Sequence, residues 1–319
     1  MIQRPFDLFA LEGSRAFAQS VASRLAVPLA PHEERRFEDG EHKARPLQSV
    51  RGHDTFVLHS LHGDDTESAN DKLCRLLFFC GALRDAGANS VTAIAPYLCY
   101  ARKDRRTKTN DPITTRYVAS LFEAIGINRV ITVEIHNVAA FENAFRCQTI
   151  HIEFAPLIAT HFAHVLRGEA IVAVSPDAGG AKREESFRQE LQRLTGREVG
   201  SAYMEKSRSE GIVSGELLAG DVQGKVAIIV DDLISTGGTL IRAARACRAA
   251  GAKKVFAAAA HGLFVSGSPD LLVEAAIDSI VVANTVPPFR LSAEKIAKLT
   301  ILDASDMVAA AVSSSRDGG

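Results

Sequence analysis

The stretch "VDDLISTGGTL", residues 230–240, decides the fold. Two adjacent carboxylates and a Ser-Thr-Gly-Gly-Thr run follow directly on the apolar segment "KVAII", residues 225–229. Glycines permit a tight backbone with inward-facing amides, threonines add hydroxyl donors, and a following helix adds the positive end of its dipole. Such a cradle fits a phosphate, and paired carboxylates accept hydrogen bonds from sugar hydroxyls. The stretch therefore predicts a sugar-phosphate site; the alternative is an ordinary helix capped by Ser235 or Thr236.

Apolar runs rich in Val and Ile alternate with amphipathic helical segments along the chain. This alternation is typical of parallel sheets covered by helices on both faces. The pattern runs twice, which predicts an α/β protein with domains at residues 1–150 and 151–305. The C-terminal tail is expected to pack back on the first domain. The expected strands are residues 54–60, 90–98, 129–136, 169–177, 225–232, 254–264 and 279–285, and the expected helices include residues 70–87, 112–126 and 237–251.

The composition agrees with two soluble domains. The chain has 319 residues, of which 46% are hydrophobic and 24% charged, and its formal net charge is -1. This charge balance points neither to nucleic acid nor to an anionic membrane as a partner. Five cysteines without a C-x-x-C pair favour free thiols in a reducing compartment. The N-terminal stretch lacks the pattern of a secretion signal, and no apolar run is long enough to cross a membrane, so a cytoplasmic protein is expected.

Polar, glycine-containing segments follow four of the expected strands, where an open parallel sheet binds its ligands. The first, residues 96–106, leads into five cations within residues 102–108, accompanied by Asp104. Guanidinium groups in such a cluster suit a polyphosphate, although a solvated charge run is the alternative. The other three segments are "EIHN" (134–137), "SPDAGG" (175–180) and the opening stretch.

Two of these segments and one long connection add candidate groups. His136 follows an apolar strand, where a histidine is either structural or a ligand. Asp177 also follows a strand, and Gly179 and Gly180 allow a close backbone approach. Residues 199–219 form a long polar connection, which is typical of a functional lid or of a disordered loop.

The segment 230–240 resembles the "VDDxxxTxGT" motif of the phosphoribosyl-pyrophosphate-binding fold, which phosphoribosyltransferases and ribose-phosphate diphosphokinases share. "YARKDRRTKTNDPIT" (100–114) is similar to the diphosphokinase segment that begins Tyr-Ala-Arg-Gln-Asp-Arg, with Lys103 in place of Gln. "FEDGE" (37–41) resembles the Phe-Ser-Asp-Gly-Glu element of that family, and "EKSRSEG" (205–211) resembles its flexible catalytic loop. The chain therefore resembles the ribose-phosphate diphosphokinases, also called phosphoribosyl pyrophosphate synthases, over nearly its whole length.

The resemblance implies two tandem phosphoribosyltransferase-like domains, the first binding ATP and the second ribose 5-phosphate. It also implies transfer of diphosphate from ATP to the 1-hydroxyl of ribose 5-phosphate, with Mg²⁺ as cofactor. The implied ATP-binding residues are Phe37, Asp39, Glu41, Arg102, Lys103, Asp104 and Arg105. The implied ribose-5-phosphate residues are Asp231, Asp232, Ser235, Thr236, Gly237, Gly238 and Thr239, the magnesium ligands are His136 and Asp177, and the catalytic residues are Lys206 and Arg208.

In the family, the Phe-Ser-Asp-Gly-Glu element reaches the adenine of ATP bound by a neighbouring subunit. The resemblance thus implies a homo-oligomer, either a dimer or a hexamer of dimers. Two alternatives remain open from the sequence. One is a phosphoribosyltransferase, which would need neither "FEDGE" nor the basic cluster. The other is a catalytically weak or inactive paralogue that regulates an active synthase, since Lys103 and Glu134 depart from the family pattern.

Overall fold

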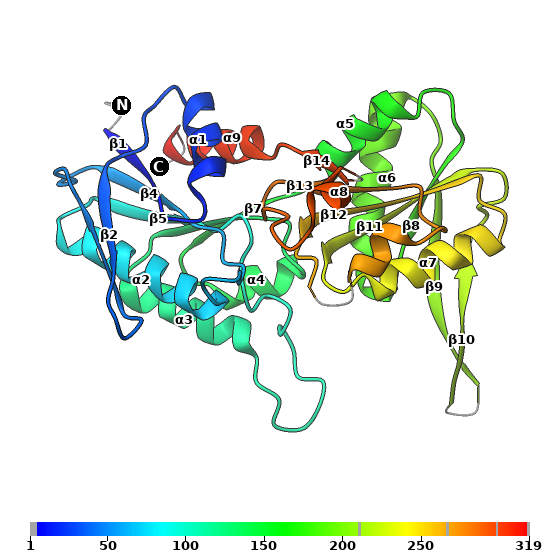
Figure 1. Cartoon of the computed structure of the whole chain (residues 1–319), viewed down its shortest axis with the longest axis horizontal. Helices are drawn as coiled ribbons and strands as arrows, with labels where there is room; N and C mark the ends of the chain where they lie inside the picture. The colour runs from blue at the N-terminus through cyan, green and yellow to red at the C-terminus, as the bar shows by residue number, and fades with distance from the viewer. Residues whose placement is uncertain (1–4, 210–211, 266–267, 298, 318–319) are drawn as a thin grey trace. The chain divides into compact units, whose positions relative to one another are not determined.

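A computed structural model of the chain describes residues 5–209, 212–265, 268–297 and 299–317 (Figure 1). The chain divides into two compact units. Unit 1 comprises residues 1–152 and 304–319, and unit 2 comprises residues 153–303. Within the described residues, no helix has the length and apolar character needed to cross a membrane.

Unit 1 is built on a parallel sheet of five strands in the order β1-β4-β5-β6-β7. Strands β1, β4, β5 and β6 are short and almost fully buried, as the continuous apolar runs predict for a sheet covered on both faces, whereas in the edge strand β7 only Ile152 is buried. The expected strand at residues 129–136 ends earlier, at Val133. The strand bounds are Phe6–Ala10 for β1, Asp54–Leu58 for β4, Ser90–Ile94 for β5, Arg129–Val133 for β6 and Gln148–Ile152 for β7.

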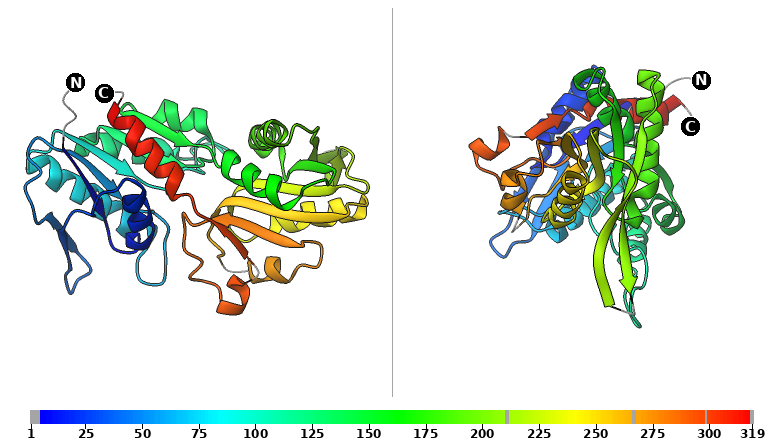
Figure 2. Two further views of the ribbon diagram at one scale, coloured as in Figure 1. Left: turned by 90° about the horizontal axis from the view of Figure 1, so that it is seen from above. Right: turned by 90° about the vertical axis from the view of Figure 1, so that its right-hand side faces the viewer.

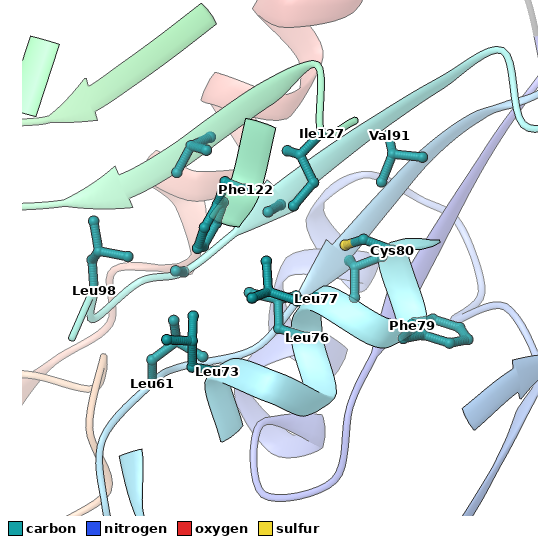
Figure 3. Close-up of a cluster of buried hydrophobic side chains, with 14 of the residues drawn as sticks. Leu61, Leu73, Leu76, Leu77, Phe79, Cys80, Val91, Leu98, Phe122 and Ile127 are labelled. Atoms are coloured by element: carbon teal, nitrogen blue, oxygen red, sulfur yellow. The ribbon is translucent and has the colours of Figure 1, made fainter. Parts of the chain in front are cut away.

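Helices cover both faces of this sheet. Alternate strand residues point to opposite faces, so Val57 packs in the cluster that contains α2 and α3, and Phe56 packs in the cluster that contains α1 and α9. Figure 3 shows the first cluster, in which Leu73, Leu76 and Leu77 of α2 lie near Phe122 of α3. The helices are α1 (Arg15–Arg24), α2 (Ala69–Asp85), α3 (Thr114–Ile125), α4 (Val138–Ala144) and α9 (Ser305–Asp317).

The C-terminal helix α9 returns to unit 1. Its residues Val308, Ala309 and Val312 are buried against Ala18 and Val21 of α1. This apolar contact is what places residues 304–319 with the first unit although the chain reaches them last.

An antiparallel hairpin stands apart from the unit 1 sheet. It consists of β2 (His32–Arg36) and β3 (His42–Pro46), and residues 37–41 form its tip. The sequence analysis predicted no strands here, because the segment is rich in charged residues and has no apolar alternation.

Unit 2 contains a seven-stranded sheet in the order β10-β9-β8-β11-β12-β13-β14. All neighbouring pairs are parallel except β9 and β10. Both sheets therefore confirm the predicted α/β class with mainly parallel sheets. The bounds are Ile171–Ser175 for β8, Gly200–Ser209 for β9, Ile212–Ala219 for β10, Val226–Ile234 for β11, Lys254–Gly262 for β12, Ser279–Ala283 for β13 and Leu299–Leu302 for β14.

Helices lie on both faces of the unit 2 sheet as well. On one face, Phe162 of α5 meets Phe187 of α6 and Phe256 of β12, with ring centroids 6.1 and 5.5 Å apart. On the other face, Leu240 and Cys247 of α7 are buried in the second core. The helices are α5 (Ala155–Val165), α6 (Ala181–Thr195), α7 (Gly238–Ala249) and α8 (Ala293–Ile296), with short 3-10 turns η1 (Ala178–Gly180) and η2 (Ser268–Val273).

The prediction of a long polar connection at residues 199–219 is wrong. Strands β9 and β10 form an antiparallel ribbon there, with a register irregularity between Val213 and Glu216. Figures 1 and 2 show this ribbon projecting from the edge of unit 2. The sequence analysis missed the ribbon because the buried alternation of β9, at Ala202 and Met204, is short and polar residues follow it in the sequence.

Candidate active site

The Ser235–Thr239 run leads from strand β11 into the first turn of helix α7, at the place where the sequence predicts a phosphate cradle. Gly237 is the N-cap of α7, has a φ of 83°, and no side chain caps the helix. Its preceding backbone is fixed, because the Ile234 carbonyl accepts the N–H groups of Leu263 and Phe264 at 2.9 and 3.2 Å. The alternative of an ordinary helix capped by Ser235 or Thr236 is therefore wrong. A glycine-led helix N-terminus without a side-chain cap is an arrangement that binds anions.

Asp231 and Asp232 lie inside the last part of strand β11, directly before the cradle. Asp232 is buried at 6% exposure, and its N–H donates to Asp231 Oδ1 at 2.9 Å. Burial, together with the charge of Asp232, raises the pKa of the Asp231 carboxyl above its usual range. The guanidinium of Arg183 opposes this rise from helix α6. The two adjacent carboxylates thus lie three and four residues before Ser235 in the chain, and both lie near the guanidinium of Arg183.

Asp177 lies in a tight turn after strand β8. Its Oδ1 accepts the N–H groups of Gly179 and Gly180 at 2.8 and 3.0 Å. A Cβ on Gly180 would lie 2.8 Å from Ser175 Oγ, so the turn needs glycine at that position. The Asp177 residue itself is exposed, which leaves the carboxylate at the surface of unit 2.

Glu184 lies in the first turn of α6 and is buried at 5% exposure. Burial raises the pKa of its carboxyl from the usual 4.5 to about 7, against the opposing effect of a hydrogen bond with Ser201. The folded chain therefore binds this proton more tightly than the unfolded chain, and stability falls as the pH rises from about 4.5 to about 7.

We expect Glu184→Gln to remove this pH dependence, because glutamine stays neutral. At pH 8 the variant should be more stable than the parent protein by about 2 kcal/mol, and near pH 4.5 the two should be alike. Thermal unfolding at both pH values measures the difference. Glu185→Gln is the matched control, since that exposed carboxylate pairs with Arg188 and its pKa is lowered. A parent protein at least as stable as E184Q at pH 8 would contradict the assignment.

In unit 1, the basic segment after strand β5 wraps around one carboxylate. Lys103 Nζ donates to Asp111 Oδ2 at 2.6 Å, and the N–H groups of Thr107 and Lys108 donate to the same oxygen, each at 3.0 Å. These interactions lower the pKa of Asp111 below its usual range. Arg102 and Arg105 are exposed. The segment is therefore a defined turn that presents guanidinium groups, and the Lys103 ammonium is paired in the ligand-free chain.

The same segment meets the histidine predicted as a metal ligand. Asn137 Nδ2 donates to Asp104 Oδ2 at 2.6 Å, which places the basic turn beside the exposed His136. Two non-glycine residues here have left-handed backbones, with φ 61° at Tyr100 and 38° at Glu134. Such strained positions gather at functional sites. The structure thus brings together the predicted residues that follow strands β5 and β6.

Phe37, Asp39 and Glu41 lie at the tip of the β2–β3 hairpin. Their hydrogen bonds are local: Phe37 N–H donates to the Glu41 carbonyl at 2.8 Å, and Glu41 N–H donates to Asp39 Oδ1 at 3.1 Å. Figure 1 shows the hairpin and the loop after Tyr100 as separate projections of unit 1. Within one chain the structure therefore does not bring the tip to the basic turn.

Lys206 and Arg208 lie on strand β9, where their backbones are in register with Glu216 and Val213 of β10. Their side chains lie outside the part of the chain that the structure describes. The two predicted magnesium ligands belong to different units, His136 to unit 1 and Asp177 to unit 2.

No group of three or more His, Cys, Asp or Glu side chains that could hold a metal exists among the described residues. The exposed carboxylate of Asp177 is the kind of hard oxygen donor that Mg²⁺ takes.

Sequence reasoning did not identify several residues of these sites. Arg183 contacts both carboxylates of β11. The sequence hinted at this role only through the position of Arg183 shortly after the Asp177 segment. No sequence motif identifies the role of Asp111 and Asn137, which hold the basic turn through hydrogen bonds. Backbone strain at Tyr100 and Glu134 is visible only in the structure.

Comparison with known protein families gives two matches within the chain. Residues 6–126 match the model of the N-terminal domain of ribose phosphate pyrophosphokinase. Residues 213–318 match the model of the phosphoribosyl synthetase-associated domain.

Curated relatives match nearly the full length. The chain is 36% identical over 311 residues to ribose-phosphate pyrophosphokinase 1 of Streptococcus pyogenes serotype M1, covering 96% of this chain and 92% of that protein. It is 34% identical to the putative ribose-phosphate pyrophosphokinase 2 of Streptococcus agalactiae serotype V, covering 97% and 91%. Among solved structures, phosphoribosylpyrophosphate synthetase from Mycobacterium smegmatis superposes with a TM-score of 0.87 at 30% identity, covering 99% of this chain and 100% of that one.

Proposed function

The chain belongs to the ribose-phosphate pyrophosphokinase family of enzymes, and we propose that its substrates are Mg-ATP and ribose 5-phosphate. It transfers diphosphate from ATP to the 1-hydroxyl of ribose 5-phosphate, which gives phosphoribosyl pyrophosphate and AMP and supplies nucleotide biosynthesis. The observation that carries the acceptor half of this proposal is the glycine-led N-terminus of α7, with Asp231 and Asp232 directly before it.

In the acceptor half, the backbone amides around Gly237 hold the 5-phosphate, and the hydroxyls of Ser235, Thr236 and Thr239 add donors. The carboxylates of Asp231 and Asp232 accept hydrogen bonds from the two ribose hydroxyls. Because phosphate and diol are bound at fixed positions, the 1-hydroxyl is oriented toward the second substrate.

In the donor half, Arg102, Lys103 and Arg105 bind the ATP phosphates, and Asp104 holds the turn through Asn137. Lys103 exchanges its partner Asp111 for a phosphate oxygen when ATP binds. Phe37, Asp39 and Glu41 complete the adenine site of a neighbouring subunit, which agrees with their place on a projecting tip that does not meet the basic turn of its own unit. We therefore propose a homo-oligomer, a dimer or a hexamer of dimers, in the cytoplasm.

Mg²⁺ is the proposed cofactor, and His136 and Asp177 are the residues that would hold it. When bound, Mg²⁺ neutralises phosphate charge and polarises the transferred group. Asp177 Oδ1 already accepts two backbone N–H groups, so its other oxygen is the one turned to this role.

The reaction forms a bond between the ribose 1-oxygen and the β-phosphorus of ATP. The bond from the β-phosphorus to the oxygen of the α-phosphate breaks, AMP leaves with that oxygen, and the hydroxyl proton is released. Lys206 and Arg208 stabilise the charge on the transferred group, and positioning and electrostatics supply most of the rate.

The test is incubation of the isolated protein with ATP, Mg²⁺ and ribose 5-phosphate, with AMP measured over time. We expect AMP only when all three are present. A protein that forms none alone, yet changes the rate of an active synthase when mixed with it, would be a regulatory paralogue. Consumption of phosphoribosyl pyrophosphate with a free base, without AMP formation, would identify a phosphoribosyltransferase.

We expect Lys103→Gln to raise KM for ATP about fivefold to tenfold and to leave KM for ribose 5-phosphate unchanged. The increase in KM is limited because Asp111 competes with ATP for the Lys103 ammonium, and because charge pairs at the protein surface contribute little to binding free energy. Initial rates at varied ATP measure it, and the second substrate serves as internal control. An unchanged KM for ATP would remove Lys103 from the phosphate site.

A further inference from the structure

Arg183 links two parts of the acceptor site that lie far apart in the sequence. From the first turn of helix α6, its NH1 lies 3.6 Å from Asp231 Oδ1 and its NH2 lies 3.9 Å from Asp232 Oδ1. The side chain is 11% exposed. One guanidinium therefore faces both carboxylates that the proposed function assigns to the ribose hydroxyls.

The same side chain packs against the Asp177 turn. Helix α6 begins at Ala181, directly after η1, and NH1 of Arg183 lies 3.7 Å from where a Cβ on Gly180 would stand. The Arg183 side chain is thus a neighbour of both the Asp177 turn and the carboxylates of Asp231 and Asp232. All of these residues belong to unit 2, so their arrangement does not depend on the other unit.

The contacts act through charge. Both distances exceed the range of a normal hydrogen bond, which ends near 3.2 Å. Among the described residues, the charged groups acting on the Asp231 carboxyl are Asp232 on its own strand, which disfavours ionisation, and Arg183, which favours it. On the neighbouring strand β12, the residue paired with Asp231 is Ala259. In a low-dielectric position two adjacent carboxylates do not both ionise readily without a nearby cation.

We propose that Arg183 is a positioning residue for ribose 5-phosphate: its charge favours the ionised form of Asp231 and Asp232, which burial and their mutual repulsion oppose, and holds both in place, so that both accept hydrogen bonds from the ribose hydroxyls. The inference rests on the proposed function of these carboxylates. It assigns Arg183 no contact with the reacting atoms, and it distinguishes Arg183 from an ion pair that only ties α6 to β11.

The test compares Arg183→Gln, Arg183→Lys and Lys182→Gln with the parent protein. Lys182 is the matched control, because it is the exposed neighbouring cation and its removal changes the net charge equally. KM for ribose 5-phosphate and kcat are measured at saturating Mg-ATP from pH 6.5 to pH 9.5. Thermal unfolding of each variant reports whether the fold is retained.

We expect R183Q to raise KM for ribose 5-phosphate more than tenfold at pH 7, with little change in kcat or in KM for ATP. The increase in KM should become smaller toward pH 9.5, where the two carboxylates ionise without the nearby charge of Arg183. R183K should restore most of the affinity, and K182Q should match the parent protein.

An R183Q variant with the parent's KM for ribose 5-phosphate at pH 7 would overturn the proposal. An increase in KM of equal size at every pH would also overturn it, because that is the result expected of a purely structural ion pair. Should R183Q fail to fold, R183K decides: KM within about threefold of the parent, with the parent's pH profile, supports the charge role. A loss in R183K that does not change with pH contradicts it. A parent protein that forms no AMP from ribose 5-phosphate would contradict the proposed function instead.

Discussion

Replacing Lys206 and Arg208 together by alanine should lower kcat at least about a thousandfold, while KM for ribose 5-phosphate changes no more than about threefold. The reason is that the two cations act on charge that builds up only during transfer, and interactions of that kind appear in kcat rather than in substrate binding. Strand β9 carries both residues on the ribbon that projects from unit 2. Steady-state kinetics with both substrates varied separates the two constants.

Arg197→Ala with Lys225→Ala is the matched control for this variant. It removes the same two charges from unit 2, but Arg197 precedes strand β9 and Lys225 precedes strand β11, so both lie before the N-terminal ends of their strands. The control should keep a kcat close to that of the parent protein. A K206A/R208A protein that turns over at a near-normal rate would remove both residues from the mechanism.

Replacing Gly237 by alanine should raise KM for ribose 5-phosphate about a hundredfold and leave KM for ATP unchanged. Gly237 has a φ of 83°, and a Cβ there would lie 2.9 Å from Leu271 Cδ2 and 3.0 Å from Leu271 Cβ. The backbone must shift to relieve this contact, and the shift displaces the amide groups proposed to hold the 5-phosphate. Steady-state kinetics and binding of ribose 5-phosphate by calorimetry both measure the loss.

Gly224→Ala tests whether strain alone explains such a loss. Gly224 also has a positive φ, 68°, but a Cβ there would meet nothing within 4 Å, and it lies before strand β11 rather than after it. We expect a small loss of stability and a normal KM. Equal KM values for G237A and the parent protein would show that the phosphate does not bind at the α7 N-terminus.

Much of the fold follows from apolar runs. The strands β4, β5, β6, β8, β11, β12 and β13 and the helices α2, α3 and α7 lie where the sequence predicted them, although β5 and β6 end three or more residues earlier, because buried parallel strands and amphipathic helices have strong periodic patterns. The β2–β3 hairpin and the β9–β10 ribbon were not predicted, for the opposite reason. Strands β2 and β3 have no fully buried residue, and in β9 the buried Ala202 and Met204 are followed by polar residues in the sequence, so charged and polar residues obscure the pairing.

The candidate site shows the same division. The positions of Asp231, Asp232 and Gly237 were predictable, because a glycine run after a buried strand indicates a turn into a helix. Arg183 was not, since its role depends on the packing of α6 against β11, which no local pattern encodes. The pairing of Lys103 with Asp111 likewise depends on a turn whose shape the sequence does not specify.

The most direct test of the proposed reaction follows the anomeric oxygen. The isolated protein is incubated with Mg-ATP and ribose 5-phosphate labelled with ¹⁸O at the 1-hydroxyl, and the products are observed by ³¹P NMR. We predict equal amounts of AMP and phosphoribosyl pyrophosphate, with the label in the bond between the ribose and the β-phosphorus. AMP that carries the label, or no AMP at all, would contradict attack of the ribose 1-hydroxyl on the β-phosphorus of ATP.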